Sequence, residues 1–260
     1  MNATIEQLQT LKLFGMLEAW NDQQTQPTYL DLSFDERFSL LVEREHLRRQ
    51  LLRQARRLKQ ATLPQASHPS LEAVDYSINR GLAKTQFLQM AGGQWVADHL
   101  QLLILGPTGV GKTFLASVLA QNLCRLGYSV RYLKTHELLT ELQLAKADGS
   151  FPKLRKRLLS FDLLILDEWV RDALNVNQAR DFLDLIDDRY RLKSCLFVTQ
   201  LPVEQWHAQI QDPTIADAIL DRIVHDSIRL PLKGESMRKL TSTIGSQKSS
   251  ANSETHKPSS

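Results

Sequence analysis

The feature that most constrains the fold is an eight-residue run where an apolar stretch gives way to glycines and then to a helix-periodic segment. It reads Gly106-Pro107-Thr108-Gly109-Val110-Gly111-Lys112-Thr113 and matches the phosphate-binding pattern G-x-x-x-x-G-K-[ST]. Backbone N–H groups of such a loop converge on phosphate oxygens, and the next helix adds its positive dipole end. Lys112, expected to face solvent, would reach the outer phosphates, and Thr113 would ligate magnesium. We predict a triphosphate site; the alternative is a chance glycine-rich turn.

Composition sets the limits on domain number and partners. A chain of 260 residues with 42% hydrophobic and 23% charged residues can bury one full core and still carry a smaller domain. Its net charge of +3 is small, so affinity for an acidic partner depends on how the charges are placed. Cys124 and Cys195 lack metal-ligand spacing, which indicates buried thiols in a reducing compartment. The N-terminus has no secretory pattern and no long apolar run follows, so we expect a cytoplasmic protein.

Changes of composition along the chain predict four parts. Residues 1–61 form a helical N-terminal domain, 62–70 a linker with two prolines, 71–244 the nucleotide domain, and 245–260 a low-complexity, disordered tail. In the nucleotide domain, short apolar strands alternate with helical patterns, which predicts an α/β fold with a mainly parallel sheet. The expected strands are 102–105, 130–133, 163–166, 196–199 and 228–230.

Two helices of this domain have clear signals at their ends. The helix after the phosphate loop should bury one apolar face and stop at Gly127; that face comprises Leu115, Val118, Leu119 and Leu123. A later helix should begin with Asp212 as N-cap and Pro213 as first residue. Its buried stripe comprises Ile215, Ile219 and Ile223.

An acidic pair follows the third predicted strand and supplies the second half of a candidate active site. Asp167 would hold the magnesium shell, and Glu168 would polarise the attacking water. The alternative is that the pair caps the next helix. A GTPase is disfavoured because Val170 stands where its Asp-x-x-Gly motif needs glycine and no Asn-Lys-x-Asp motif occurs. Neither a substrate base nor a mobile lid of a small-molecule kinase is evident.

Two polar residues end the next predicted strand. Thr199 and Gln200 would face the γ-phosphate if the sheet has the usual phosphate-loop strand order. Either could sense the nucleotide. The alternative, simple strand termination and turn entry, is left open.

A basic run in residues 37–59 is the candidate DNA-binding element. On a helix, a leucine seam would pack and the opposite face would be basic; the seam comprises Leu40, Leu47, Leu51 and Leu58, and the candidate DNA contacts are Arg49, Arg53, Arg56 and Arg57. Arg44 and Arg48 fall on the leucine side, where they either extend along apolar surface or meet an acidic neighbour. The competing interpretation is a solvated helix in a small bundle.

A second basic cluster lies between two predicted strands, near Gly149. Its candidate DNA contacts are Lys153, Arg155 and Arg157, with Lys156 beside them. In a ring or filament this segment could face the central axis and touch phosphate, by analogy with related folds. Backbone contacts carry no base information, so we expect binding to duplex DNA that is largely independent of sequence.

From Ser70 to Lys239 the chain resembles the IstB family of transposition helper ATPases, kin of the DnaC helicase loader within the AAA+ superfamily. The segments that carry the resemblance are Asp75-Tyr76, the phosphate loop, 129–133, 163–169, 189–190, 201–203, 212–214, 216–222 and 233–239. Two departures stand out: Gln200 replaces an Asn that often ends the sensor strand, and Val170 replaces a common Gly.

The resemblance implies a Mg²⁺-dependent ATPase that self-assembles on DNA into a ring or filament and recruits or activates a partner transposase. It places Arg222 as an arginine finger on a neighbouring subunit's nucleotide and Arg238 as second sensor, and it implies that the C-terminal lid is reduced or absent. From its own surroundings in the sequence, Arg222 would be read as a solvated helix residue. The functional alternatives are a helicase loader, which differs in its partner, and a DNA-binding adaptor with a structural nucleotide, which Glu168 argues against.

Overall fold

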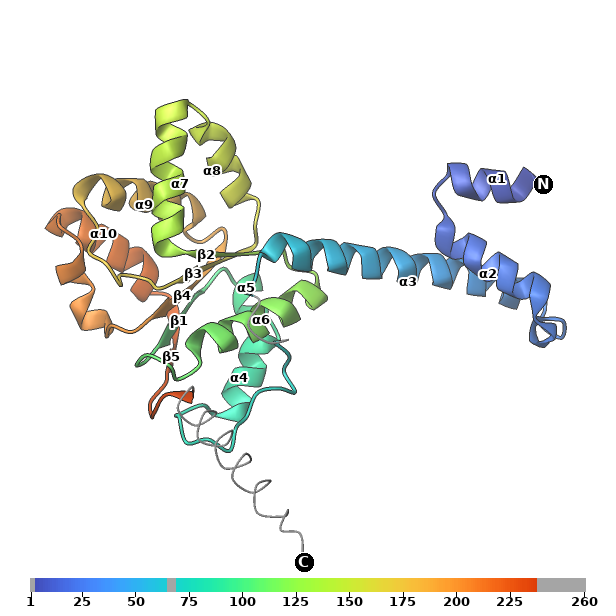
Figure 1. The fold of residues 1–260 in the computed structure, drawn as a ribbon, viewed down its shortest axis with the longest axis horizontal. Coiled ribbons are helices and arrows are strands. Elements are labelled where there is room, and N and C mark those ends of the chain that lie inside the picture. The colour runs from blue at the N-terminus through green and yellow to red at the C-terminus, as the bar shows by residue number, and fades with distance from the viewer. Residues whose placement is uncertain (1–2, 65–68, 238–260) are drawn as a thin grey trace, which may run out of the picture. The chain divides into compact units, whose positions relative to one another are not determined.

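The computed structural model describes residues 3–64 and 69–237, which divide into two compact units. Unit 1 comprises residues 1–59 and unit 2 residues 60–260, and the boundary falls inside the long helix α3 (Figure 1). The predicted tail, the predicted second sensor Arg238 and any C-terminal lid lie outside the described residues.

Unit 1 is helical. Its elements are α1 (Ala3–Thr10), α2 (Phe14–Thr25), the short 3-10 helix η1 (Pro27–Tyr29) and α3 (Phe34–Ala61). Gly15 lets α2 approach α3 closely, since a Cβ there would lie 2.7 Å from the Cα of Glu45. The Glu45 carboxylate, 6% exposed, accepts the N–H of Gly15 at 2.7 Å and pairs with Arg49 at 2.6 Å. Burial alone would raise the pKa of Glu45, but these contacts bring it below its ordinary value.

The predicted packing of the leucine seam is wrong. Leu47 and Leu51 are 47% and 55% exposed, and Leu40 is also exposed, whereas Leu41 is buried with Glu45. Leu58, the last residue of the seam, is half-buried. α2 packs on the neighbouring face of α3, where Gly15 permits close contact.

Acidic partners on α2 explain the two arginines on the leucine side of α3. Arg44 pairs with Asp22 at 3.6 Å, and Arg48 pairs with Glu18 at 3.8 Å. Of the two alternatives for these arginines, the structure shows acidic neighbours.

Unit 2 is built on a five-stranded parallel sheet in the order β2-β3-β4-β1-β5. The strands are β1 (Gln101–Leu105), β2 (Val130–Lys134), β3 (Leu163–Asp167), β4 (Ser194–Thr199) and β5 (Ser227–Pro231). Figure 1 shows helices α7 to α10 on one side of the sheet and α4 to α6 on the other. Each predicted strand and the parallel α/β architecture are confirmed.

The helices and short 3-10 turns of unit 2 alternate with these strands. They are α4 (Lys84–Ala91), α5 (Gln94–Ala97), α6 (Lys112–Leu126), α7 (Thr135–Asp148), α8 (Phe151–Leu159), α9 (Val176–Arg189), η2 (Val203–Gln205), η3 (His207–Gln209) and α10 (Pro213–Val224). As predicted, Gly127 ends α6 with a φ of 107°, and Asp212 caps α10 by accepting the N–H groups of Thr214 and Ile215. The predicted buried faces of α6 and α10 and the burial of both cysteine thiols are also confirmed.

The topology brings the candidate site to one edge of the sheet. Because all five strands are parallel and β4 lies between β3 and β1, the carboxyl ends of these three strands meet where the phosphate loop begins. Asp167 and Thr199 are the last residues of β3 and β4. Among the described residues, no helix is both long and apolar enough to cross a bilayer.

Candidate nucleotide-binding site

The phosphate loop connects β1 to α6 and folds around the lysine side chain. Lys112 Nζ donates to the carbonyl oxygens of Gly106 at 2.7 Å and Pro107 at 2.8 Å. Lys112 is only 8% exposed, so the expectation that it faces solvent is wrong. Its ammonium group is instead held by the two carbonyl groups of the phosphate loop. Burial lowers the pKa of Lys112, and the nearby Asp167 carboxylate opposes that shift.

The loop glycines leave room for neighbouring segments. Gly106 has a φ of 150°, and a Cβ there would lie 2.5 Å from the carbonyl oxygen of Leu232. Gly111 has a φ of 91°, and a Cβ there would lie 2.9 Å from a guanidinium nitrogen of Arg80. The segment after β5 follows the loop, with the N–H of Met237 donating to the carbonyl of Gly109 at 2.9 Å. A side chain at these glycines would displace backbone or a buried cation.

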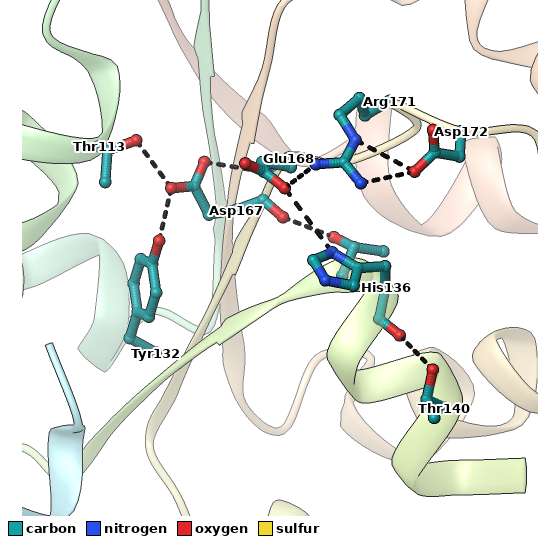
Figure 2. A network of polar contacts seen from close by, with 9 residues as sticks. Thr113, Tyr132, His136, Thr140, Asp167, Glu168, Arg171 and Asp172 are labelled. Atoms are coloured by element: carbon teal, nitrogen blue, oxygen red, sulfur yellow. Dashed lines mark hydrogen bonds and ion pairs between the residues drawn. The ribbon is translucent and has the colours of Figure 1, made fainter. Parts of the chain in front are cut away.

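The Asp167 carboxylate joins the loop to the sheet edge (Figure 2). Its Oδ2 accepts the Thr113 hydroxyl at 2.7 Å and the Tyr132 hydroxyl at 2.6 Å. Its Oδ1 accepts the N–H of Glu168 at 2.8 Å. Asp167 is 4% exposed, so these contacts compensate a buried carboxylate. The carboxylate and the Thr113 oxygen form a hard oxygen donor pair beside the phosphate loop, which suits Mg²⁺ shared with substrate phosphates.

Tyr132, on β2, is a site residue that the sequence analysis missed. Burial, together with the hydrogen bond to Asp167, raises the pKa of Tyr132 far above its ordinary value, so its hydroxyl remains a proton donor to the carboxylate. The one available signal was a hydroxyl group on a predicted strand; in the structure that strand pairs with the strand that ends in Asp167.

Glu168 lies beside Asp167 but has different partners. Its carboxylate forms an ion pair with Arg171 and lies 3.7 Å from His136 Nδ1, as Figure 2 shows. The alternative that the acidic pair caps the next helix is wrong, because Asn175 caps α9 through a capping box with Gln178. Neither Asp167 nor Glu168 therefore serves as the N-cap of α9.

The turn after the acidic pair tolerates the departure at Val170. Glu168 and Val170 have φ values of 57° and 47°, which is unfavourable for a β-branched residue and natural for glycine. Asp167 nevertheless completes β3 in register, opposite Lys134. Asp167, the candidate metal ligand, therefore keeps its place at the end of β3 although the turn that follows is strained.

The two sensor candidates separate by their surroundings. Thr199 is buried, and its hydroxyl donates to the carbonyl of Trp169 at 2.9 Å. Gln200 is exposed, and its Oε1 accepts the hydroxyl of Thr108 in the phosphate loop at 2.6 Å. Thr199 therefore stabilises the turn after β3, whereas Gln200 contacts the phosphate loop directly.

Arg222 lies on α10 and contacts α9. It forms an ion pair with Asp187, and its Nη1 donates to the carbonyl of Ala218 at 2.8 Å. Across residues 3–64 and 69–237, neither its ion pair nor this hydrogen bond reaches the phosphate loop of its own chain.

The basic residues predicted to contact DNA differ in their exposure and in whether they form ion pairs. Arg155 and Arg157 on α8 form ion pairs with Asp188 and Glu141, while Lys153 is exposed. On α3, Arg53 and Arg56 are exposed, Arg57 is half-buried, and Arg49 is paired with Glu45. The DNA-binding assignment of these residues stays a prediction.

The strand order, the phosphate loop after β1 and the acidic pair after β3 define a phosphate-loop nucleotide-binding domain of the AAA+ class. The fold is similar to that of AMPPCP-bound DnaA from Aquifex aeolicus, with a TM-score of 0.56 and 17% identity over 71% of this chain and 56% of that one. It is also similar to DnaI, with a TM-score of 0.54 and 21% identity over 65% of this chain and 90% of that one.

Within this class the chain belongs to the IstB family, since the model described as "IstB-like ATP binding protein" matches residues 6–244. It is 41% identical to an insertion sequence ATP-binding protein of Sinorhizobium fredii, over 91% of this chain and 96% of that protein. It is 43% identical to the IS1162 ATP-binding protein of Pseudomonas fluorescens, over 76% of this chain and 86% of that protein. The resemblance drawn from the motifs is confirmed.

Proposed function

We propose that the protein is a Mg²⁺-dependent ATPase that assembles on duplex DNA and recruits or activates the transposase of its insertion sequence. The observation that carries this proposal is the Thr113–Asp167–Tyr132 network at the mouth of the phosphate loop, with Glu168 next to it. The names of the relatives, which tie them to ATP and to insertion sequences, support the same function. They also favour transposition over helicase loading.

The geometry of the site supports the following roles for residues within one subunit. Lys112 would leave its loop carbonyls to bind the outer phosphates, and Thr113 and Asp167 would hold the metal ion. When bound, Mg²⁺ neutralises phosphate charge as it develops. Glu168 accepts a proton from the attacking water, and Gln200, through its contact with Thr108, responds to the γ-phosphate.

Completion of the site requires a second subunit in this proposal. Arg222 contacts α9 rather than its own phosphate loop, which supports a role on a neighbour's nucleotide. Self-assembly into a ring or filament would bring such an arginine to each active site. Residues 1–61, through Arg53, Arg56 and the rest of the basic face, would hold the DNA backbone.

The test is ATP turnover with and without duplex DNA, at saturating Mg²⁺. We expect turnover that DNA stimulates, and none for Lys112→Ala, which loses charge-assisted contacts to phosphate. Tight ATP binding without any turnover, with and without DNA, would favour the adaptor with a structural nucleotide. Unchanged ATP affinity in Lys112→Ala would reject the phosphate-loop assignment.

A further inference from the structure

A buried arginine lies against the phosphate loop and has no part in the proposed reaction. Arg80 is 3% exposed and belongs to the segment that precedes α4. Its Nη1 donates to the carbonyl of Val110, in the loop, at 3.3 Å, and its Nη2 donates to the carbonyl of Asp75 at 3.0 Å. Its Nε is buried and has no acceptor among the described residues.

The charge of Arg80 lacks a directly paired anion. Within residues 3–64 and 69–237, no carboxylate lies within ion-pair distance of its guanidinium. The nearby Asp75 carboxylate instead accepts the N–H and hydroxyl of Ser77, at 2.8 and 2.6 Å. Burial lowers the pKa of Arg80, and the Asp75 charge only partly opposes this shift. A buried cation held only by neutral carbonyls is costly, and an anion nearby reduces that cost.

The loop is shaped around this cation. Gly111 is the position where a Cβ would lie 2.9 Å from Arg80 Nη1, so glycine there admits the guanidinium. The Arg80 carbonyl also accepts the N–H of Lys233, at 2.9 Å, which fastens the segment after β5 beside the loop. The guanidinium is therefore held against Val110 and Gly111, in the part of the loop whose backbone is expected to bind phosphate.

We propose that Arg80 is a positioning residue whose buried charge is matched by the phosphates of the bound nucleotide. It would hold the Val110 carbonyl so that the loop N–H groups point at the ligand, and its positive charge would favour the more anionic nucleotide. This inference rests on nucleotide binding at the phosphate loop. It predicts that the contribution of Arg80 grows with the number of phosphates on the ligand.

The experiment measures the affinity of ATP, ADP and adenosine for the full chain and for three variants, together with melting temperatures of the nucleotide-free proteins. Arg80→Met removes the charge, Arg80→Lys keeps it, and Arg229→Met is the matched control at an exposed arginine on β5. We expect Arg80→Met to weaken ATP by about tenfold or more, ADP by less and adenosine not at all, since Coulomb attraction scales with ligand charge. Arg80→Lys should stay within about threefold of wild type for ATP, because the charge remains.

The outcomes separate this inference from the proposed function. If the wild-type protein does not bind ATP, nucleotide binding itself fails. If it binds ATP and Arg80→Met binds equally well, or loses all three ligands to the same extent, charge matching is wrong. If Arg80→Met does not fold, the neutral variant Arg80→Gln takes its place: a loss of affinity that is larger for ATP than for ADP supports the proposal, and an ATP affinity equal to that of the wild type would overturn it.

Discussion

The phosphate-loop site of unit 2 and helix α3 of unit 1 hold their charged side chains in different ways. In the site, Lys112 and Asp167 are buried and each is held by two or more hydrogen bonds. On α3, Arg53 and Arg56 are exposed, and Leu47 and Leu51 are exposed on the same helix. The first arrangement suits one ligand in one geometry, and the second suits contacts that tolerate many DNA sequences. Substitutions in the site should therefore abolish one reaction, whereas substitutions on α3 should weaken binding by increments.

The largest effect is expected for Arg222→Ala. If this arginine stabilises charge on a neighbour's γ-phosphate, turnover should fall by about a thousandfold while each subunit still binds ATP. Asp187→Asn is the matched control, because it breaks the ion pair with α9 and leaves the arginine in place. Turnover and ATP affinity measured on both variants decide: equal losses in the two would make Arg222 a residue of the α9–α10 contact.

Glu168→Gln should come next, with turnover lower by about a hundredfold or more, since the amide cannot accept a proton. ATP affinity should be retained. Asp172→Asn, which removes the other carboxylate that pairs with Arg171, serves as control and should turn over ATP normally. Normal steady-state turnover in Glu168→Gln would move the general base elsewhere.

Tyr132→Phe should raise the Mg²⁺ concentration needed for half-maximal turnover by about tenfold, because the hydroxyl that orients the Asp167 carboxylate is lost. Turnover at saturating Mg²⁺ should change less. The measurement is a Mg²⁺ titration of ATP turnover. The control is Tyr190→Phe, at the tyrosine that follows the last residue of α9. An unchanged titration curve would show that the Tyr132 hydroxyl is not needed to orient Asp167.

The smallest effect per residue is expected on α3. The double variant Arg53→Ala and Arg56→Ala should lower the slope of log affinity for duplex DNA against log salt by about two, since each lost phosphate contact removes about one counterion. The control replaces Arg44 and Arg48, which pair with α2, and should leave the slope unchanged. Identical slopes for both double variants and wild type would make α3 a scaffold.

The sequence was sufficient to predict the strands of unit 2 and the place of Asp167 at the edge of the sheet. The strands of unit 2 are short and mostly rich in apolar residues, and parallel strands bring their carboxyl ends to one edge. Asp167 was therefore expected beside the phosphate loop from the sequence. The capping residues Gly127 and Asp212 were also predictable, because their chemistry is local.

The remaining features depend on which surfaces meet. A helix offers several faces, and the stripe through Leu47 and Leu51 was a better apolar pattern than the face of Leu41 and Glu45; Gly15 on α2 decides which one packs. Tyr132 and Arg80 were missed for a related reason. Each side chain gains its role from a residue distant in the sequence, which is Asp167 for Tyr132 and Val110 for Arg80.

The central claim, an active site completed by a second subunit, is tested most directly by mixing two inactive proteins. Arg222→Ala keeps the phosphate loop, and Lys112→Ala keeps the arginine. In assemblies on DNA verified by electron microscopy, the mixture should recover part of the wild-type turnover, because some interfaces then combine an intact loop with an intact arginine. No recovery in well-formed mixed assemblies, or full activity of monomeric Arg222→Ala, would contradict the account.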